Sequence, residues 1–204
     1  MPTGVKEAQN TAKGLQTREK IFDAAEQLIL AKSFNGIGLS EILKASHIPK
    51  GSFYHYFASK EDFGARLIEH YAAQKGPQVH KQLFEAGGTA RDRVLGIIKA
   101  EMEKTKSASF RISCLVVKLS GEIATTSEPM RTALEEASAS WIKKYADVVR
   151  QGHLDGSMPS ALDPDATGQV IHLGLSGAMM QASIQNSTEP YDAFMKTMER
   201  LTAA

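Results

Sequence analysis

The segment from residue 38 to residue 57 constrains the fold of this chain more than any other part of its sequence. It holds two short runs in which apolar residues recur at helical spacing, and Pro49 lies between them. The residue before a proline avoids helical geometry, so the first run has to end there. The second run starts with Lys50-Gly51-Ser52. Two short helices joined by a tight turn are therefore predicted, an arrangement typical of a DNA-reading helix-turn-helix.

The second of these helices, expected over residues 50–57, has one apolar side and one polar side. Phe53 and Phe57 are four residues apart, so they share a side and are predicted to anchor the helix to a small core. A purely structural helix is the alternative, but burying Tyr54-His55-Tyr56 without hydrogen-bond partners is costly. The polar side is expected to meet phosphates and base edges through Lys50, Ser52, Tyr54 and His55, with Gly51 allowing close approach of the backbone.

Helical spacing of apolar residues continues along the chain and no useful stretch alternates with period two, so the expected fold is all-α. Thr17 is expected to cap the first helix, and Phe34-Asn35-Gly36 to end it. Ser59 opens a capping-box-like step for the fourth helix, which Gly76-Pro77 is expected to kink or interrupt. The expected helices cover residues 17–33, 40 to the turn before Pro49, 50–57, 59 onward, 90–106, 113–124, 128–151, 163–185 and 191–202.

Composition and charge suit a regulator that binds DNA at one end. The 204 residues suffice for a sizeable core, and a net charge of +1 argues against coating nucleic acid over the whole surface. Residues 1–75 hold ten Lys and Arg against eight Asp and Glu, and the remainder holds fourteen against fifteen, so the positive excess is N-terminal. The polar stretch 1–16 is expected to be a flexible arm, and no eighteen-residue apolar run predicts a membrane span.

The sequence predicts neither a metal nor a nucleotide cofactor. Cys114 is the only cysteine, which excludes an intrachain disulfide and favours a reducing cytoplasm. The histidines have no metal-ligand spacing with one another or with Cys114, and no glycine-rich loop follows a predicted strand.

From Thr17 to about Tyr71 the chain resembles the N-terminal domain of the TetR-type transcriptional repressors. The resemblance rests on Lys50 to Phe57 and on the step Ser59-Lys60-Glu61 that follows. It implies a homodimer with a DNA-binding domain at 17–75 and an effector-sensing, dimerising domain at 76–204, and it makes Lys50, Gly51 and His55 the expected base contacts. By the same resemblance the operator is contacted by Lys50, Gly51, Ser52, Tyr54, His55 and Tyr56, and its phosphates are held by Thr17, Arg18, Ser40 and Lys60.

The late helices carry small residues among larger apolar ones, which allows helices to approach closely. By resemblance, this segment and Glu128 to Arg150 form a four-helix interface between two subunits, and for any single residue intrachain core is an equal alternative. The late-helix residues in question are Leu173, Gly174, Leu175, Ser176, Gly177, Ala178, Met179, Met180 and Ala182. A dimer has to place its two reading helices about 34 Å apart to read a palindromic site.

Cys114 is the candidate sensor. It precedes a short predicted helix with Lys118 on the same face, and both a helix N-terminus and a nearby ammonium favour the thiolate. The alternative is a buried, unreactive cysteine. Residues 113–122 and 127–131 resemble the TetR-type repressors that sense electrophiles such as N-ethylmaleimide and control reductases. Those relatives carry a lysine where this chain has Ser183, a departure that tells against cysteine–lysine cross-chemistry.

Three functional readings remain open at this level. The first is a repressor released by an electrophile or oxidant at Cys114, and the second is a repressor with a non-covalent inducer in an apolar pocket. A thiol-dependent enzyme is the third, and it lacks a histidine base next to Cys114 in sequence. The residues that could line such a pocket are Met102, Phe110, Trp141, Tyr145, His172 and Met179. For each of them the alternative is a purely structural position in the hydrophobic core.

Overall fold

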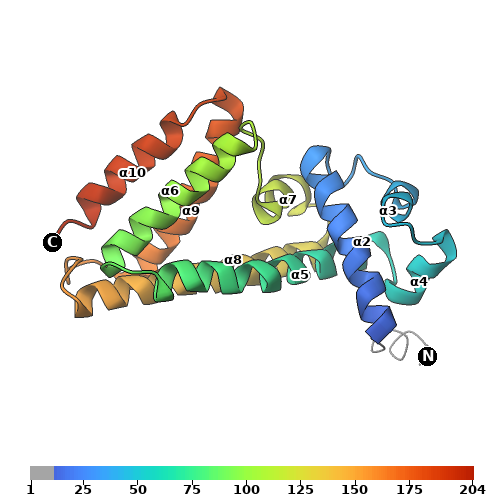
Figure 1. The fold of residues 1–204 in the computed structure, drawn as a ribbon, viewed down its shortest axis with the longest axis horizontal. Helices are drawn as coiled ribbons and strands as arrows, with labels where there is room; N and C mark the ends of the chain where they lie inside the picture. The colour runs from blue at the N-terminus through green and yellow to red at the C-terminus, as the bar shows by residue number, and fades with distance from the viewer. Residues whose placement is uncertain (1–11) are drawn as a thin grey trace. The chain divides into compact units, whose positions relative to one another are not determined.

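The structure, a computed structural model, describes residues 12–204, and in that range it is helical with no strand, as predicted (Figure 1). The rest of the expected N-terminal arm, residues 1–11, lies outside the described residues. The α-helices are α2 (Ala12–Ala31), α3 (Leu39–Ala45), α4 (Phe53–Tyr56), α5 (Lys60–His80), α6 (Ala90–Ser107), α7 (Leu115–Ile123), α8 (Glu128–Leu154), α9 (Pro164–Gln185) and α10 (Glu189–Leu201), with a 3-10 turn η1 (Lys50–Ser52) and a π-helical turn η2 (Lys81–Glu85).

The first helix begins earlier than its sequence signals predicted. Thr17 lies inside α2 rather than at its cap, and residues 12–16, expected to belong to the arm, are helical. The residues before Thr17 include Ala12, Lys13 and Leu15, which are good helix formers. The helix therefore extends through Thr17 toward the N-terminus instead of starting there.

The α5 helix starts as predicted but is not interrupted at its glycine-proline pair. The Ser59 hydroxyl accepts a hydrogen bond from the Asp62 N–H at 3.1 Å, which caps the helix. Pro77 lies within α5, which runs on to His80. The missing proline N–H deprives Ala73 of a donor, and Ala73 is exposed, so water can satisfy its carbonyl.

Contacts divide the described chain into two compact units. The first holds the residues up to Tyr71 together with Cys114–Glu135, and the second holds Ala72–Ser113 and Glu136–Ala204. This division differs from the boundary expected after residue 75, because α7 and the first turns of α8 pack with the N-terminal helices. Cys114 therefore belongs to the same compact unit as the helix-turn-helix.

Four buried phenylalanines form the centre of the first unit. Ring centroids lie 5.0 Å apart for Phe53–Phe57 and for Phe57–Phe63, and Phe22 of α2 stacks at 5.9 Å from Phe63. Aromatic pairs at these separations add about 0.5–1.5 kcal/mol each to what burial contributes. The predicted anchoring of the reading helix through Phe53 and Phe57 is thus confirmed, since both side chains have no exposed surface.

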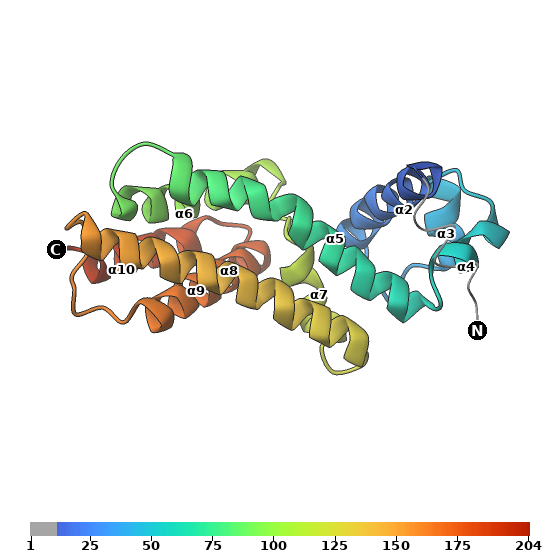
Figure 2. The same cartoon turned by 90° about the horizontal axis from the view of Figure 1, so that it is seen from below.

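The second unit packs α6, α9 and α10 side by side, and Figure 2 shows the same helices from below. Two glycines of α9 allow the closest approaches. A Cβ at Gly168 would lie 2.7 Å from the backbone nitrogen of Ala146 in α8, and one at Gly174 would lie 2.1 Å from the ring of Phe194 in α10. Because both positions lack a side chain, the backbone of α9 can contact the backbone of α8 at Gly168 and the Phe194 ring of α10 at Gly174.

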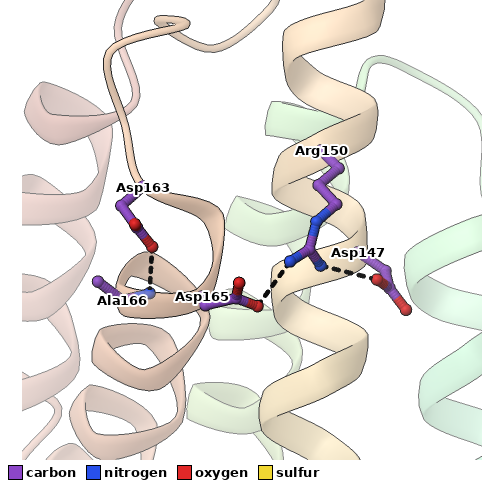
Figure 3. A network of polar contacts seen from close by, with 5 residues as sticks. All are labelled: Asp147, Arg150, Asp163, Asp165 and Ala166. Carbon is purple, nitrogen blue, oxygen red and sulfur yellow. Dashed lines mark hydrogen bonds and ion pairs between the residues drawn. The ribbon is translucent and has the colours of Figure 1, made fainter.

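An ion-pair network at the surface links α8 to the start of α9 (Figure 3). The Arg150 guanidinium donates to Asp147 at 2.9 Å and to Asp165 at 2.6 Å. Asp163 caps α9 by accepting from the Ala166 N–H at 2.8 Å, where the sequence predicts the start of a helix over residues 163–185. The pairs are solvent-exposed, so water and salt screen them and they contribute little to stability.

A glycine-to-alanine pair tests the close packing of α8 on α9. In Gly168→Ala the new methyl meets backbone atoms that cannot give way, so the free energy of unfolding should fall by about 1–3 kcal/mol. In Gly96→Ala of α6, where nothing lies within 4 Å, it should rise by up to about 1 kcal/mol. Urea unfolding of both variants at one protein concentration measures the difference, and equal values for the two would contradict the packing described here.

Candidate nucleic-acid interface and sensor site

The turn between α3 and the reading helix is built by a left-handed residue. His47 has φ 57°, and after it the Ile48 N–H donates to the Leu43 carbonyl at 2.9 Å. The His47 N–H donates to the Lys44 carbonyl at 3.2 Å, which completes a Schellman motif at the end of α3. Glycine is usual at this position, so the sequence pattern did not mark His47 as the residue that turns the chain.

The reading helix is shorter than predicted and begins as a 3-10 turn. Residues 50–57 were expected to form one helix, whereas η1 covers Lys50–Ser52 and α4 is the single turn Phe53–Tyr56. Tyr54 is 61% exposed and His55 is exposed, while Ser52 and Tyr56 are half-buried. Gly51 is exposed with no atom within 4 Å of where a Cβ would be, as close approach to a duplex requires. The side chain of Lys50 lies outside the described residues.

The residues expected to hold phosphates occupy different positions. Thr17 and Arg18 lie half-buried within α2, away from a helix start, and Ser40 is exposed in the first turn of α3. The ammonium of Lys60 instead points into the loop between α2 and α3, where it donates to the carbonyls of Phe34 at 2.8 Å and Ile37 at 2.7 Å. Phosphate contact by these residues stays a prediction, and for Lys60 the structure shows a role in holding that loop.

The same loop is held from its other side by Glu122 of α7. The two carboxylate oxygens accept from the N–H groups of Phe34 at 3.0 Å and Asn35 at 2.7 Å. Bonds from backbone N–H groups to a carboxylate are about twice as strong as neutral ones. The sequence pattern missed Glu122, because a single acidic residue in an amphipathic helix looks the same whether it faces water or a loop 87 residues away.

Cys114 is the N-cap residue of α7 and is half-buried. Its side chain hydrogen-bonds with the hydroxyl of Tyr71 on α5, and the Leu115 N–H also reaches that hydroxyl. Burial, followed by the neighbouring Cys114, raises the pKa of Tyr71 well above its usual range, so Tyr71 stays a neutral donor. Cys114 is thus neither fully exposed nor sealed in the core, and it lies at a helix N-terminus as predicted. Lys118 is half-buried one turn further along α7.

Of the predicted pocket residues, the structure brings Trp141 and His172 together. Their ring centroids lie 6.1 Å apart, on α8 and α9 of the second unit. Burial lowers the pKa of His172 below its ordinary value of 6.5, so the imidazole is neutral at pH 7. Tyr145 and Met179 are buried on the same two helices, whereas Met102 and Phe110 are half-buried on α6 and the segment after it.

Residues 12–204 contain neither a metal-binding cluster nor a membrane-spanning helix. No cluster of three or more His, Cys, Asp or Glu side chains in this range could hold a metal ion. None of its helices is long and apolar enough to cross a membrane.

Comparison with known proteins identifies the family. Residues 21–67 match the model described as bacterial regulatory proteins, tetR family, and residues 90–198 match the model described as tetracyclin repressor-like, C-terminal domain. An all-helical fold with an N-terminal helix-turn-helix, matched in this way, defines a DNA-binding transcriptional regulator. The chain belongs to the TetR family.

The relatives include repressors that align along nearly the whole chain. The HTH-type transcriptional repressor NemR of Escherichia coli K12 is 36% identical over 92% of this chain and 94% of its own length. Transcriptional regulator AcuR of Cereibacter sphaeroides is 29% identical over 89% of this chain and 83% of its own. The crystal structure of the reduced form of E. coli NemR matches with a TM-score of 0.85 and 34% identity, covering 92% of this chain and 98% of that one. The predicted TetR-type resemblance is confirmed, and the enzyme reading is set aside.

The Trp141–His172 contact gives a pH readout of the second unit. Because burial lowers the pKa of His172, lowering the pH through 6.5 protonates this residue in the unfolded chain before it does so in the native one, which reduces stability. Trp141 is the only tryptophan, and a protonated imidazole quenches indole fluorescence. Native fluorescence should therefore fall with a midpoint below pH 6.5, and should stay flat in His172→Asn but not in His80→Asn. A midpoint above 6.5 would contradict the burial of His172.

Proposed function

We propose that this TetR-family repressor binds a palindromic operator as a cytoplasmic homodimer and is released when Cys114 reacts with an electrophile or an oxidant. The observation that carries the DNA-binding part is the one-turn helix α4, which keeps Phe53 fully buried and Tyr54 largely exposed. A polar face held rigidly over a phenylalanine core can enter a major groove without rearranging. The operator contacts we propose are those of Lys50, Gly51, Ser52, Tyr54, His55 and Tyr56.

The exposed face of α9 supports a dimer. Val170, Leu173, Met180 and Ile184 are large apolar residues exposed on this helix, at spacings that place them on one face. Leu175, Ala178, Met179 and Ala182 are buried within the chain instead, so the predicted interface residues divide between the two faces of α9. A contiguous exposed apolar stripe typically marks an interaction surface, and a second copy of the chain is the occupant we propose.

The position of Cys114 supports a covalent trigger. The half-buried thiol lies at the N-terminus of α7, where the helix dipole favours the thiolate, and Tyr71 donates to it. In the reaction with N-ethylmaleimide the thiolate sulfur bonds to one alkene carbon, the C=C π bond breaks, and the other carbon takes up a proton. Cys114 is also the only cysteine, and the similar NemR structure is that of a reduced form.

Tyrosine variants test the DNA-reading surface. On DNA from upstream of the chain's own gene, the parent should bind specifically and lose affinity steeply with salt. Tyr54→Ala should weaken binding about 10-fold, and Tyr54→Phe only about 3-fold, since the ring stays and a single hydroxyl contact is lost. Lys196→Ala, an exposed lysine of α10, should leave binding unchanged. A mobility-shift titration measures all four proteins, and parent-like affinity in Tyr54→Ala would remove α4 from the interface.

A serine variant tests the trigger. N-ethylmaleimide should weaken operator binding by the parent about 10- to 100-fold, corresponding to about 1.4–2.7 kcal/mol of coupling, and should leave Cys114→Ser unaffected. Mass spectrometry confirms addition at one site. If Cys114→Ser is released like the parent, the covalent trigger is wrong, and a non-covalent inducer near Trp141 and His172 becomes the better explanation.

A further inference from the structure

The backbone of Phe34, in the first compact unit, is held by opposite charges from two different helices. The Phe34 N–H donates to Glu122 of α7, while the Phe34 carbonyl accepts from the ammonium of Lys60 at the start of α5. The Lys60 ammonium also lies 4.7 Å from the centroid of the Phe34 ring. The loop that leads into α3 is therefore positioned by α7 on one side and by the start of α5 on the other.

The packing around Phe34 leaves the loop little freedom to move by itself. Its side chain is 3% exposed, and a Cβ at Gly64 of α5 would meet both the Phe34 ring at 2.9 Å and Met130 of α8 at 2.5 Å. A densely packed interior of this kind shifts between discrete arrangements rather than deforming gradually. A displacement of Glu122 therefore has to move the loop or break its two hydrogen bonds.

The α7 helix joins this contact to the thiol. Cys114 caps the N-terminus of α7 and Glu122 lies near its C-terminus, a separation of about 12 Å along a helix that rises 1.5 Å per residue. Both ends belong to the first compact unit, and α7 packs against α2. A group added to the Cys114 sulfur that shifts α7 as one body would displace both of these ends together.

We infer that Glu122 is the positioning residue through which modification of Cys114 reaches the DNA-binding helices. The inference rests on the proposed function and adds to it the route of the signal. The Cys114 sulfur is not in a disulfide in the structure, and our inference assigns the two Glu122 hydrogen bonds to the state that binds the operator. Breaking them removes the hold of α7 on the α2–α3 loop, which remains bound to Lys60, and so changes the orientation of α3 and α4 on the duplex.

A double-mutant cycle between Glu122 and the modified thiol tests the route. Unmodified Glu122→Ala should bind the upstream DNA about 10- to 100-fold more weakly than the parent, and N-ethylmaleimide should weaken it less than about 3-fold further. Glu122→Gln keeps one acceptor oxygen. Its DNA affinity and its response to N-ethylmaleimide should lie between those of the parent and those of Glu122→Ala. Glu135→Gln, an exposed carboxylate of α8 paired with Arg131, is the matched control and should behave as the parent.

Each outcome separates the inference from the proposed function. Glu122→Ala could bind DNA more weakly while N-ethylmaleimide still lowers its affinity by the same factor as in the parent. The two effects would then be additive, and Glu122 would have only a structural role. Parent-like affinity and release in Glu122→Ala also overturn the inference. If Glu122→Ala does not fold by circular dichroism, Glu122→Gln decides by the same criteria. If the unmutated protein is not released by N-ethylmaleimide, it is the proposed function that fails.

Discussion

The burial of Phe53 and Phe57 is the constraint on which the DNA-binding unit depends. A helix of one turn is unstable in water, because nucleation fixes several residues for a single hydrogen bond. The α4 helix consists of four residues and follows a 3-10 turn, so only the aromatic core beneath it can hold it in place. Phe22 and Phe63 supply that core from α2 and α5. The exposed side of α4 is rigid because its other side is fully buried.

Charge has a second, more local part in the same unit. The partly buried N–H and C=O groups of the α2–α3 loop need hydrogen-bond partners, since an unsatisfied buried group costs about 1–3 kcal/mol. Glu122 and Lys60 satisfy four of these groups with charged partners. The position of the loop therefore depends on the positions of two helices, α7 and α5. These hydrogen bonds stabilise the loop while Cys114 is unmodified, and under our inference their loss carries the effect of its modification to the DNA-binding helices.

The accuracy of the sequence-based expectations followed the range of the interactions behind them. The long helices, the Ser59 cap and the apolar side of α4 depend on neighbours within four residues, and the sequence predicts all three. The prediction that Thr17 caps the first helix is wrong, because threonine occurs inside helices as well as at their starts and the sequence does not separate the two cases. The resemblance implies that Lys60 contacts phosphate. The sequence does not reveal its contacts with the Phe34 and Ile37 carbonyls, because these lie more than twenty residues away.

Sequence alone determined that this chain is all-helical and that it carries a helix-turn-helix with an aromatic anchor, because periodicity and local motifs encode these properties. Its resemblance to the TetR-type repressors indicated the family, which the comparisons confirm. Tertiary structure alone decided that α7 packs with the N-terminal helices, that Cys114 meets Tyr71, and that Glu122 holds the loop into α3. Those contacts join residues 40 to 90 positions apart. Their pairing depends on how the helices pack, and no local spacing in the sequence records it.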